Sequence, residues 1–332
     1  MGITRYNDPG VSPRTEAYAA VEMLRHATSH IVLDRLGLTK PMPKNKSQTI
    51  RFRRPRTFGA ATVPLQEGVT PNATQFRYDD VETMLKQYGM IVEITDVIED
   101  THEDPVLNDA AAAAGENIGR TIEALTFGTV IAGTSVFYNN GAARNAVNTA
   151  ITLNRIRAVV RFLKAQKAMP FTKILDASVK YATRWVESAF IAVAHTDLEA
   201  DIRNLAGFMP IAGYGTRSVV HENELGTVEG VRFILSADFT KWADGGGAVN
   251  AMVTTANTAA DVYPVLFFGR DAFATVPLRG EGAVNPSIIR PGTRSKSDPL
   301  GQRGYIGWKT YHTSVILNQL WMARLEVAAT AI

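Results

Sequence analysis

The hydrophobic pattern changes period along the chain, and its longest helical stretch predicts a helix over residues 104–133. Asp104 is a good N-cap residue, and Pro105 suits the first helical position because no amide hydrogen bond is needed there. Ile118 and Ile122 recur at helical spacing after a run of five alanines. At 1.5 Å per residue this helix would be roughly 40 Å long. We therefore expect the rest of the fold to be built along it.

The remaining patterns predict an α+β fold. Amphipathic stretches predict helices over residues 15–36, 152–169 and 177–194. Alternating or short apolar runs predict strands over residues 88–95, 173–175, 230–235, 262–268, 272–277 and 304–328. We expect the last of these to pair with the strand at 83–97, so that both ends of the chain share one sheet beside the long helix. The mixed elements between 170 and 300 predict a compact α+β lobe.

The segment from residue 39 to residue 80 fits neither pattern. Its five prolines exclude a helix, whereas residues 49–53 and 74–78 are typical of two strands. Apolar side chains are sparse between them, and legs of about ten residues would project by ~30 Å. An isolated two-stranded hairpin is only marginally stable in water. We therefore expect this arm to lie on a neighbouring subunit.

The arm contains the candidate contact residues. They are cationic and aromatic side chains: Arg51, Arg53, Arg54, Arg56, Phe58 and Phe76. An acidic turn further along offers candidate ion-pair partners on another copy: Glu99, Asp100, Glu103 and Asp104. The alternative is that the arginines contact phosphates as a nucleic-acid-binding protein. Only Phe52 is interleaved with them, so base stacking has little support.

Composition excludes several classes of protein. The 332 residues include no cysteine, which excludes disulfides, thiolate nucleophiles and cysteine metal sites. A net charge of +3 is too small to indicate a dedicated nucleic-acid-binding protein. No apolar run approaches ~20 residues, so no membrane span is predicted. The first residues also lack the basic and then apolar pattern of a signal peptide.

Few residues have the pattern of a catalytic or metal site. His26 and His30 have the spacing of two metal ligands on one helix face, without an evident third ligand. The stretch around His102 lacks EF-hand spacing, and an acidic helix start explains it equally well. The glycine-rich runs 213–215 and 245–247 lack a phosphate-binding pattern. We predict no catalytic residue, cofactor or metal; a metal-assisted soluble enzyme built on the acidic stretch is the alternative.

Three stretches in this order resemble one family. They are NELGTVEGVRFILSADF (223–239), YPVLFFGRDAFATVPL (263–278) and DPLGQRGYIGWKTYHTSVILNQLWMARLE (298–326). Together they resemble the major capsid proteins of tailed phages, in the family typified by the coat protein of N-four-type podophages. The third stretch is the most specific. The resemblance covers most of the chain, from about residue 15 to residue 328.

The resemblance implies the Hong Kong 97 type coat fold, which is an α+β architecture. The implied parts are an N-terminal arm and helix (1–36), an extended E-loop hairpin (37–80), a peripheral or P-domain (81–169) with its spine helix (104–133), an axial or A-domain (170–300), and C-terminal P-domain strands (301–332). The hairpin that is too poor in apolar side chains to stand alone then becomes the arm that overlaps the adjacent subunit.

The resemblance also implies a structural protein without an active site. Its copies would form the hexamers and pentamers of an icosahedral phage head around double-stranded DNA, assembled in the cytoplasm of the host bacterium. The implied partners are other copies, a portal, decoration proteins, and packaged DNA through weak non-specific contacts. A separate scaffolding protein is implied because the stretch before the first predicted helix is too short for a scaffolding region. No residue matches a cross-linking motif.

Overall fold

The computed structural model describes residues 31–45, 47–56, 58–64, 67–68, 70, 72–101, 106–175, 183–215, 219–278, 284–292, 294 and 298–332. Its helices and 3-10 turns are α2 (Leu33–Leu36), α3 (Asp96–Thr101), α4 (Val106–Ile131), η1 (Arg144–Ala146), α5 (Leu153–Ala165), η2 (Thr196–Leu198), α6 (Glu199–Arg203), η3 (Ile211–Gly213) and η4 (Gln319–Trp321). Its strands are β1 (Leu38–Thr39), β2 (Thr49–Pro55), β3 (Tyr78–Met84), β4 (Lys86–Thr95), β5 (Val136–Tyr138), β6 (Phe171–Leu175), β7 (Thr183–His195), β8 (Met209–Pro210), β9 (Glu224–Val228), β10 (Val231–Ser236), β11 (Val262–Phe268), β12 (Phe273–Thr275), β13 (Val284–Ile289), β14 (Arg303–His312), β15 (Ser314–Ile316) and β16 (Met322–Ala328).

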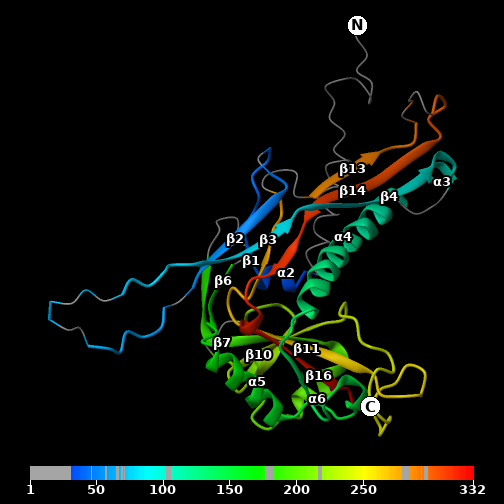
Figure 1. The fold of residues 1–332 in the computed structure, drawn as a ribbon. Helices are drawn as coiled ribbons and strands as arrows, with labels where there is room; N and C mark the ends of the chain where they lie inside the picture. Colours follow the sequence, from blue (N-terminus) through cyan, green and yellow to red (C-terminus); the bar gives the residue numbers. More distant parts are fainter. Residues whose placement is uncertain are drawn as a thin grey trace.

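Helix α4 runs beneath the upper sheet and ends at the lower body of the molecule (Figure 1). Its small side chains bring it close to that sheet, since Ala111 and Ala114 are buried in one cluster with Trp308. The helix predicted over 104–133 is confirmed from Val106 to Ile131. The predicted capping residues before it lie outside the described part of the chain.

The upper sheet is antiparallel, with the strand order β13-β14-β4. Strand β14 pairs with β4 along its whole length, from Arg303 opposite Thr95 to His312 opposite Lys86. This confirms the predicted pairing between the strand near residue 90 and the first part of the tail. One face of the sheet packs on α4 through alternate residues such as Ile94.

The lower body is built on a sheet with the order β5-β16-β11-β7-β10-β9-β8, to which β6 adds by pairing with β7. Helix α5 buries Ile156, Val159 and Leu163 in the cluster on one face. On the other face, Phe127 at the end of α4 stacks on Phe239 with 4.9 Å between ring centroids. The central strands are thus covered on both faces.

The helix predicted over 177–194 is wrong from residue 183 onward, because residues 183–195 form strand β7, and residues 177–182 lie outside the described residues. This strand lies between β10 and β11, and residues 190–194 are all buried. A strand covered on both faces presents a continuous apolar run, so the alternation that distinguishes strand from helix disappears. Strands far away in the sequence decided this element.

The tail divides between the two sheets, so the prediction that all of it joins the strand at 83–97 is wrong in its second half. Strand β14 does join β4, but β16 lies between β11 and β5 in the lower body. Alternation identifies a strand without indicating which sheet it enters, because that depends on the connection between strands. Here β15 and η4 carry the chain from one sheet to the other.

The second strand of the arm also differs from the prediction. The sequence indicated residues 74–78, whereas β3 begins at Tyr78 and ends at Met84. Its register places Asp80 opposite Arg53 and Glu82 opposite Arg51. Opposite charges on directly facing positions stabilise an antiparallel pair, so cross-strand pairing outweighed the β-propensity of residues 74–77.

A buried carboxyl group attaches α2 to α4. The backbone amides of Val32 and Leu33 donate to Glu123 with N···O distances of 2.9–3.1 Å. Glu123 is 1% exposed, and burial raises its pKa to about 8 from an ordinary value of 4.5. The carboxylates of Asp34 and Asp238 act in the same direction. The neutral form of this side chain is thus favoured by folding.

This pKa predicts a pH-dependent stability. The contribution of Glu123 is complete below about pH 4.5 and is lost as the pH rises through about 8. Relative to Glu123→Gln, the wild-type chain should therefore lose about 1.4 kcal/mol of unfolding free energy per pH unit between the two pKa values. Urea unfolding of both chains across this range measures the difference. Glu116→Gln, on the exposed side of the same helix, is the control; a wild-type–Glu123→Gln difference that is constant with pH would contradict the prediction.

Candidate functional site

The hairpin of β2 and β3 continues into a loop, residues 56–77, that extends away from the body of the molecule (Figure 1). The described side chains of this loop are open to solvent: Phe58 is 57% exposed, Val63 83% and Phe76 53%. Large apolar side chains that are this exposed on a projecting loop are unusual for a monomer, and they indicate a surface for a partner.

The root of the hairpin, in contrast, is packed on its own chain. Met42, Phe52 and Leu85 are buried in a cluster with Ala274 and Val276. Strand β1 pairs with β12, and the hydroxyl groups of Thr83 and Thr313 lie 3.0 Å apart. The sequence did not reveal this surface, because its residues come from distant strands. The body therefore fixes the direction of the arm, while the loop beyond it stays uncovered.

A ladder of ion pairs joins the two strands of the arm. Arg53 Nε lies 3.2 Å from Asp80 Oδ1, and Arg56 Nε donates to Asp79 Oδ1 at 2.7 Å. Arg54 also reaches Asp79, and Arg51 pairs with Glu82 and Asp80; these are the remaining rungs. The hydrogen bond from Arg56 lowers the pKa of Asp79 below its ordinary value. Such exposed pairs add little stability, but they hold the register.

The ladder changes the interpretation of the arginines. Four arginines on β2 and just after it face three carboxylates, which are Asp79, Asp80 and Glu82. Most of their charge is compensated within the arm, so the alternative of a phosphate-binding surface at residues 51–56 loses its main support. The signal was present in the sequence, because RFRRPR and YDDVE match in reverse order when the two segments are paired as strands.

Three aromatic rings form a row where the strands end and the loop begins. The centroids of Phe58 and Phe76 are 5.9 Å apart, and those of Phe76 and Tyr78 are 4.6 Å apart with the rings edge to face. Tyr78 is 52% exposed, and Arg53 lies over its ring at 5.7 Å. The structure thus brings all six predicted arm residues onto one hairpin and adds Tyr78, which the sequence analysis missed.

The predicted acidic partners lie elsewhere. Asp100 is exposed on α3, at the far end of the upper sheet from the arm (Figure 1). Glu103 and Asp104 lie outside the described residues, as do His26, His30 and His102, and the side chain of Glu99 is not described. Asp100 therefore does not meet the arginines within one chain. Whether these acids meet them between copies stays a prediction.

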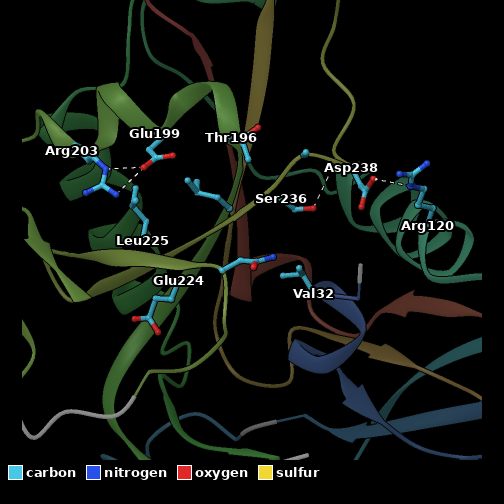
Figure 2. A pocket seen from close by; sticks show the side chains of 12 residues that line it. Val32, Arg120, Thr196, Glu199, Arg203, Glu224, Leu225, Ser236 and Asp238 are labelled. Carbon is cyan, nitrogen blue, oxygen red and sulfur yellow. Dashed lines mark hydrogen bonds and ion pairs between the residues drawn. The ribbon is translucent and has the colours of Figure 1, made fainter. Parts of the chain in front are cut away.

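A cavity of about 580 Å³ lies between α4, α6 and β10 (Figure 2). Its charged side chains are paired with one another or with neighbouring residues, within α6 in one case and between elements in the others. Arg203 pairs with Glu199 at 2.8 Å, and Arg120 lies 3.6 Å from Asp238. A third carboxylate, Glu224, is paired with the buried Arg232 at 3.4 Å. The cavity therefore presents paired charges rather than an acid, a base or a nucleophile directed at a substrate.

In the described part of the chain, no group of three or more histidine, aspartate or glutamate side chains is arranged to hold a metal ion. Over the same ranges, no helix combines the length and the apolar character that a bilayer crossing requires. The projecting arm is therefore the feature of the described structure that most needs a functional explanation.

Comparison with known proteins gives consistent matches. A family model described as "Phage capsid protein" matches residues 78–325. The major capsid protein of Pseudomonas phage KPP21 is 21% identical over 284 residues, which cover 78% of this chain and 70% of that protein.

Solved structures with a similar fold are also capsids. The capsid of Ralstonia phage GP4 is similar with a TM-score of 0.62 and 13% identity, over 89% of this chain and 87% of that one. The capsid of cyanophage Pam1 is similar with a TM-score of 0.61 and 13% identity, over 92% and 93%. At such low identity these matches show the fold.

Proposed function

Because the chain belongs to the phage capsid protein family and is a major capsid protein with the Hong Kong 97 type fold, we propose that the β2–β3 arm is the element by which each copy holds its neighbour in the shell. The observation that carries this proposal is the row of Phe58, Phe76 and Tyr78, half exposed on an arm whose root is buried. Exposed aromatic side chains on a rigid support are typical anchors of protein interfaces.

The construction of the arm supports this role. Its packed root and its ion-pair ladder hold the two strands in one register before any contact is made. An arm ordered in advance loses less conformational entropy on binding than a flexible one, so more of the contact energy appears as affinity. Phe58 and Phe76 would then supply apolar contact, while Arg51, Arg53, Arg54 and Arg56 contribute orientation. Glu99, Asp100, Glu103 and Asp104 of another copy remain the proposed acidic partners.

The proposed particle is a closed shell of many copies. Copies form hexamers and pentamers that close into the icosahedral head around double-stranded DNA, in the cytoplasm of the host. A separate scaffolding protein, a portal and decoration proteins are the further proposed partners. The proposed domain boundaries lie at residues 36, 80, 169 and 300. Strand β3 crosses the boundary at residue 80, and β16, in the C-terminal segment, belongs to the lower sheet.

Membership of a family of capsid proteins supports a structural role for the chain. The enzyme alternative rested on residues 102–104, which lie outside the described residues. The cavity in Figure 2, with its paired charges, gives it no support. The nucleic-acid alternative at residues 51–56 is disfavoured by the carboxylates of β3. Neither alternative explains the exposed aromatic row.

Replacing the two loop aromatics tests the proposal. Phe58→Ser with Phe76→Ser should leave the folded subunit intact, because both rings are more than half exposed. If each buried ring contributes about 1.4 kcal/mol or more to the contact, loss of both should raise the concentration needed for assembly at least ~100-fold. Light scattering and negative-stain electron microscopy measure assembly. Leu300→Ser, also exposed but outside the arm, is the control. Assembly of the double variant at the wild-type concentration would contradict the proposal.

A further inference from the structure

The solvent-exposed face of helix α5 has no role in the proposed contacts between copies. The exposed side chains are Arg157, Arg161 and Lys164 on the helix and Lys167 just beyond its end, and the helix contains no aspartate or glutamate. Positions 157, 161 and 164 follow helical spacing, so their side chains lie on one side of the helix. From Arg157 to Lys164 the cationic face extends by about 10 Å at 1.5 Å per residue, and Lys167 follows two residues after the helix ends at Ala165. It lies on the outside of the lower body (Figure 1).

Little negative charge compensates this face. Glu229, in the turn between β9 and β10, accepts hydrogen bonds from Arg157 at 2.7 and 3.0 Å. Among the residues that the structure describes, no carboxylate lies within ion-pair distance of Arg161, Lys164 or Lys167. The arm is different, because its arginines face three carboxylates. The arginines of residues 51–56 are denser in the sequence than the basic residues of α5. In the fold, however, the carboxylates of β3 compensate most of their charge, whereas most of the basic residues of α5 keep theirs.

The face also lacks the features of a protein-binding surface. Its exposed residues are polar, charged or small, and its larger apolar side chains, such as Phe162, pack inward against the core. Protein interfaces are usually anchored by buried aromatic or aliphatic side chains, and none is exposed between residues 153 and 168. A polyanion with evenly spaced charges needs no such anchor. Over about 10 Å, one DNA strand presents about three phosphates.

We propose that the outer face of α5 binds the phosphate backbone of the packaged nucleic acid. The assignment rests on the proposed function, since it requires that the chain encloses nucleic acid. The contacts are ionic and without base readout, so binding is independent of sequence and weakens as salt is added. A duplex passing over Arg161, Lys164 and Lys167 releases its condensed counterions there, and this release drives the association.

A salt titration tests the assignment. The unassembled full-length chain is mixed with a fluorescent DNA duplex, and the dissociation constant is measured by anisotropy at several salt concentrations. The test variant is Arg161→Gln, Lys164→Gln and Lys167→Asn; asparagine is chosen because residue 167 has a φ of 55°. The control is Arg53→Gln, Arg54→Gln and Arg56→Gln, which removes the same charge from the arm. Circular dichroism verifies that both variants are folded.

The test variant should lose about 2–3 from the slope of log K against log salt, at about 0.9 per phosphate contact, while the control keeps the wild-type slope. An unchanged slope in the test variant overturns the assignment, as does an equal loss in both variants. Poly-glutamate is titrated in parallel: selective loss of its binding, with duplex binding intact, would assign the face to an acidic protein instead. Electron microscopy separately records shell formation, so a failure of the shell proposal is distinguished from a failure at α5.

Discussion

A chain in which residues 57–76 are replaced by an Asn-Gly turn is expected to fold normally and to form no closed shells. The replacement is geometrically mild, because Arg56 N–H already donates to Arg77 C=O at 3.0 Å and Asn-Gly closes antiparallel strands. It removes Phe58 and Phe76 together with the whole loop, while the buried root around Phe52 stays in place. Since the described side chains of the loop are exposed to solvent, its loss should cost the subunit little stability.

Electron microscopy and analytical ultracentrifugation measure this outcome, with thermal unfolding as the test of the subunit. A second chain, in which residues 57–76 become a glycine–serine linker of equal length, keeps the reach of the loop but removes its side chains. If this chain also fails to assemble, the side chains provide the contact; if it assembles, the reach of the chain suffices. Normal shells from the Asn-Gly chain would show that the loop is dispensable and that the arm was misassigned.

The second large effect is expected at Glu326, where Glu326→Ala should lower the free energy of unfolding by about 3–5 kcal/mol. Glu326 is fully buried on β16, and Arg144 donates to both of its carboxylate oxygens at 2.8 and 2.9 Å. Arg324 Nε lies 3.0 Å from the same carboxylate. Arg144 also stacks on Trp242 at 3.5 Å. Removing the carboxylate leaves two arginines close together with no counter-charge between them.

Urea unfolding of the unassembled chain measures this loss. Glu326→Gln should fall between wild type and Glu326→Ala, because it keeps an acceptor but removes the charge. Glu116→Ala is the matched control: its carboxylate is 44% exposed and 3.8 Å from Arg120, so the expected change is below about 1 kcal/mol. Equal effects at Glu326 and Glu116 would contradict the role assigned to the buried cluster.

These two predictions separate stability from assembly. The subunit is stabilised where distant segments meet, as at Glu326 between β11 and β5 and at Phe52 under β12. The loop beyond the root contributes surface for contact and little to folding. We therefore expect the Asn-Gly chain to be a stable monomer and Glu326→Ala to be a weakened one that still carries an intact arm.

The candidate site was predictable in its residues but not in its geometry. The prolines and arginines of 39–80 exclude a helix and indicate an arm, and Phe58 and Phe76 do lie on it. The sequence analysis does not identify Asp79 and Asp80 as the partners of the arginines, because it does not align the second strand of the arm with the first. Their register depends on which residues face each other across the hairpin, and a one-residue slip would change every pair.

By itself the sequence determined the local elements whose period is clear: the long helix, whose alanines allow close packing, the strand near residue 90, the amphipathic α5, and a proline-rich arm with too little apolar surface to form a body. Only the tertiary structure decided that residues 183–195 are a strand, that the tail serves two sheets, and that Glu123 and Glu326 are buried among their partners. The physical reason is the range of the interactions. Helical and alternating periods are set by neighbours along the chain, whereas burial on both faces and buried ion pairs depend on segments that only the fold brings together.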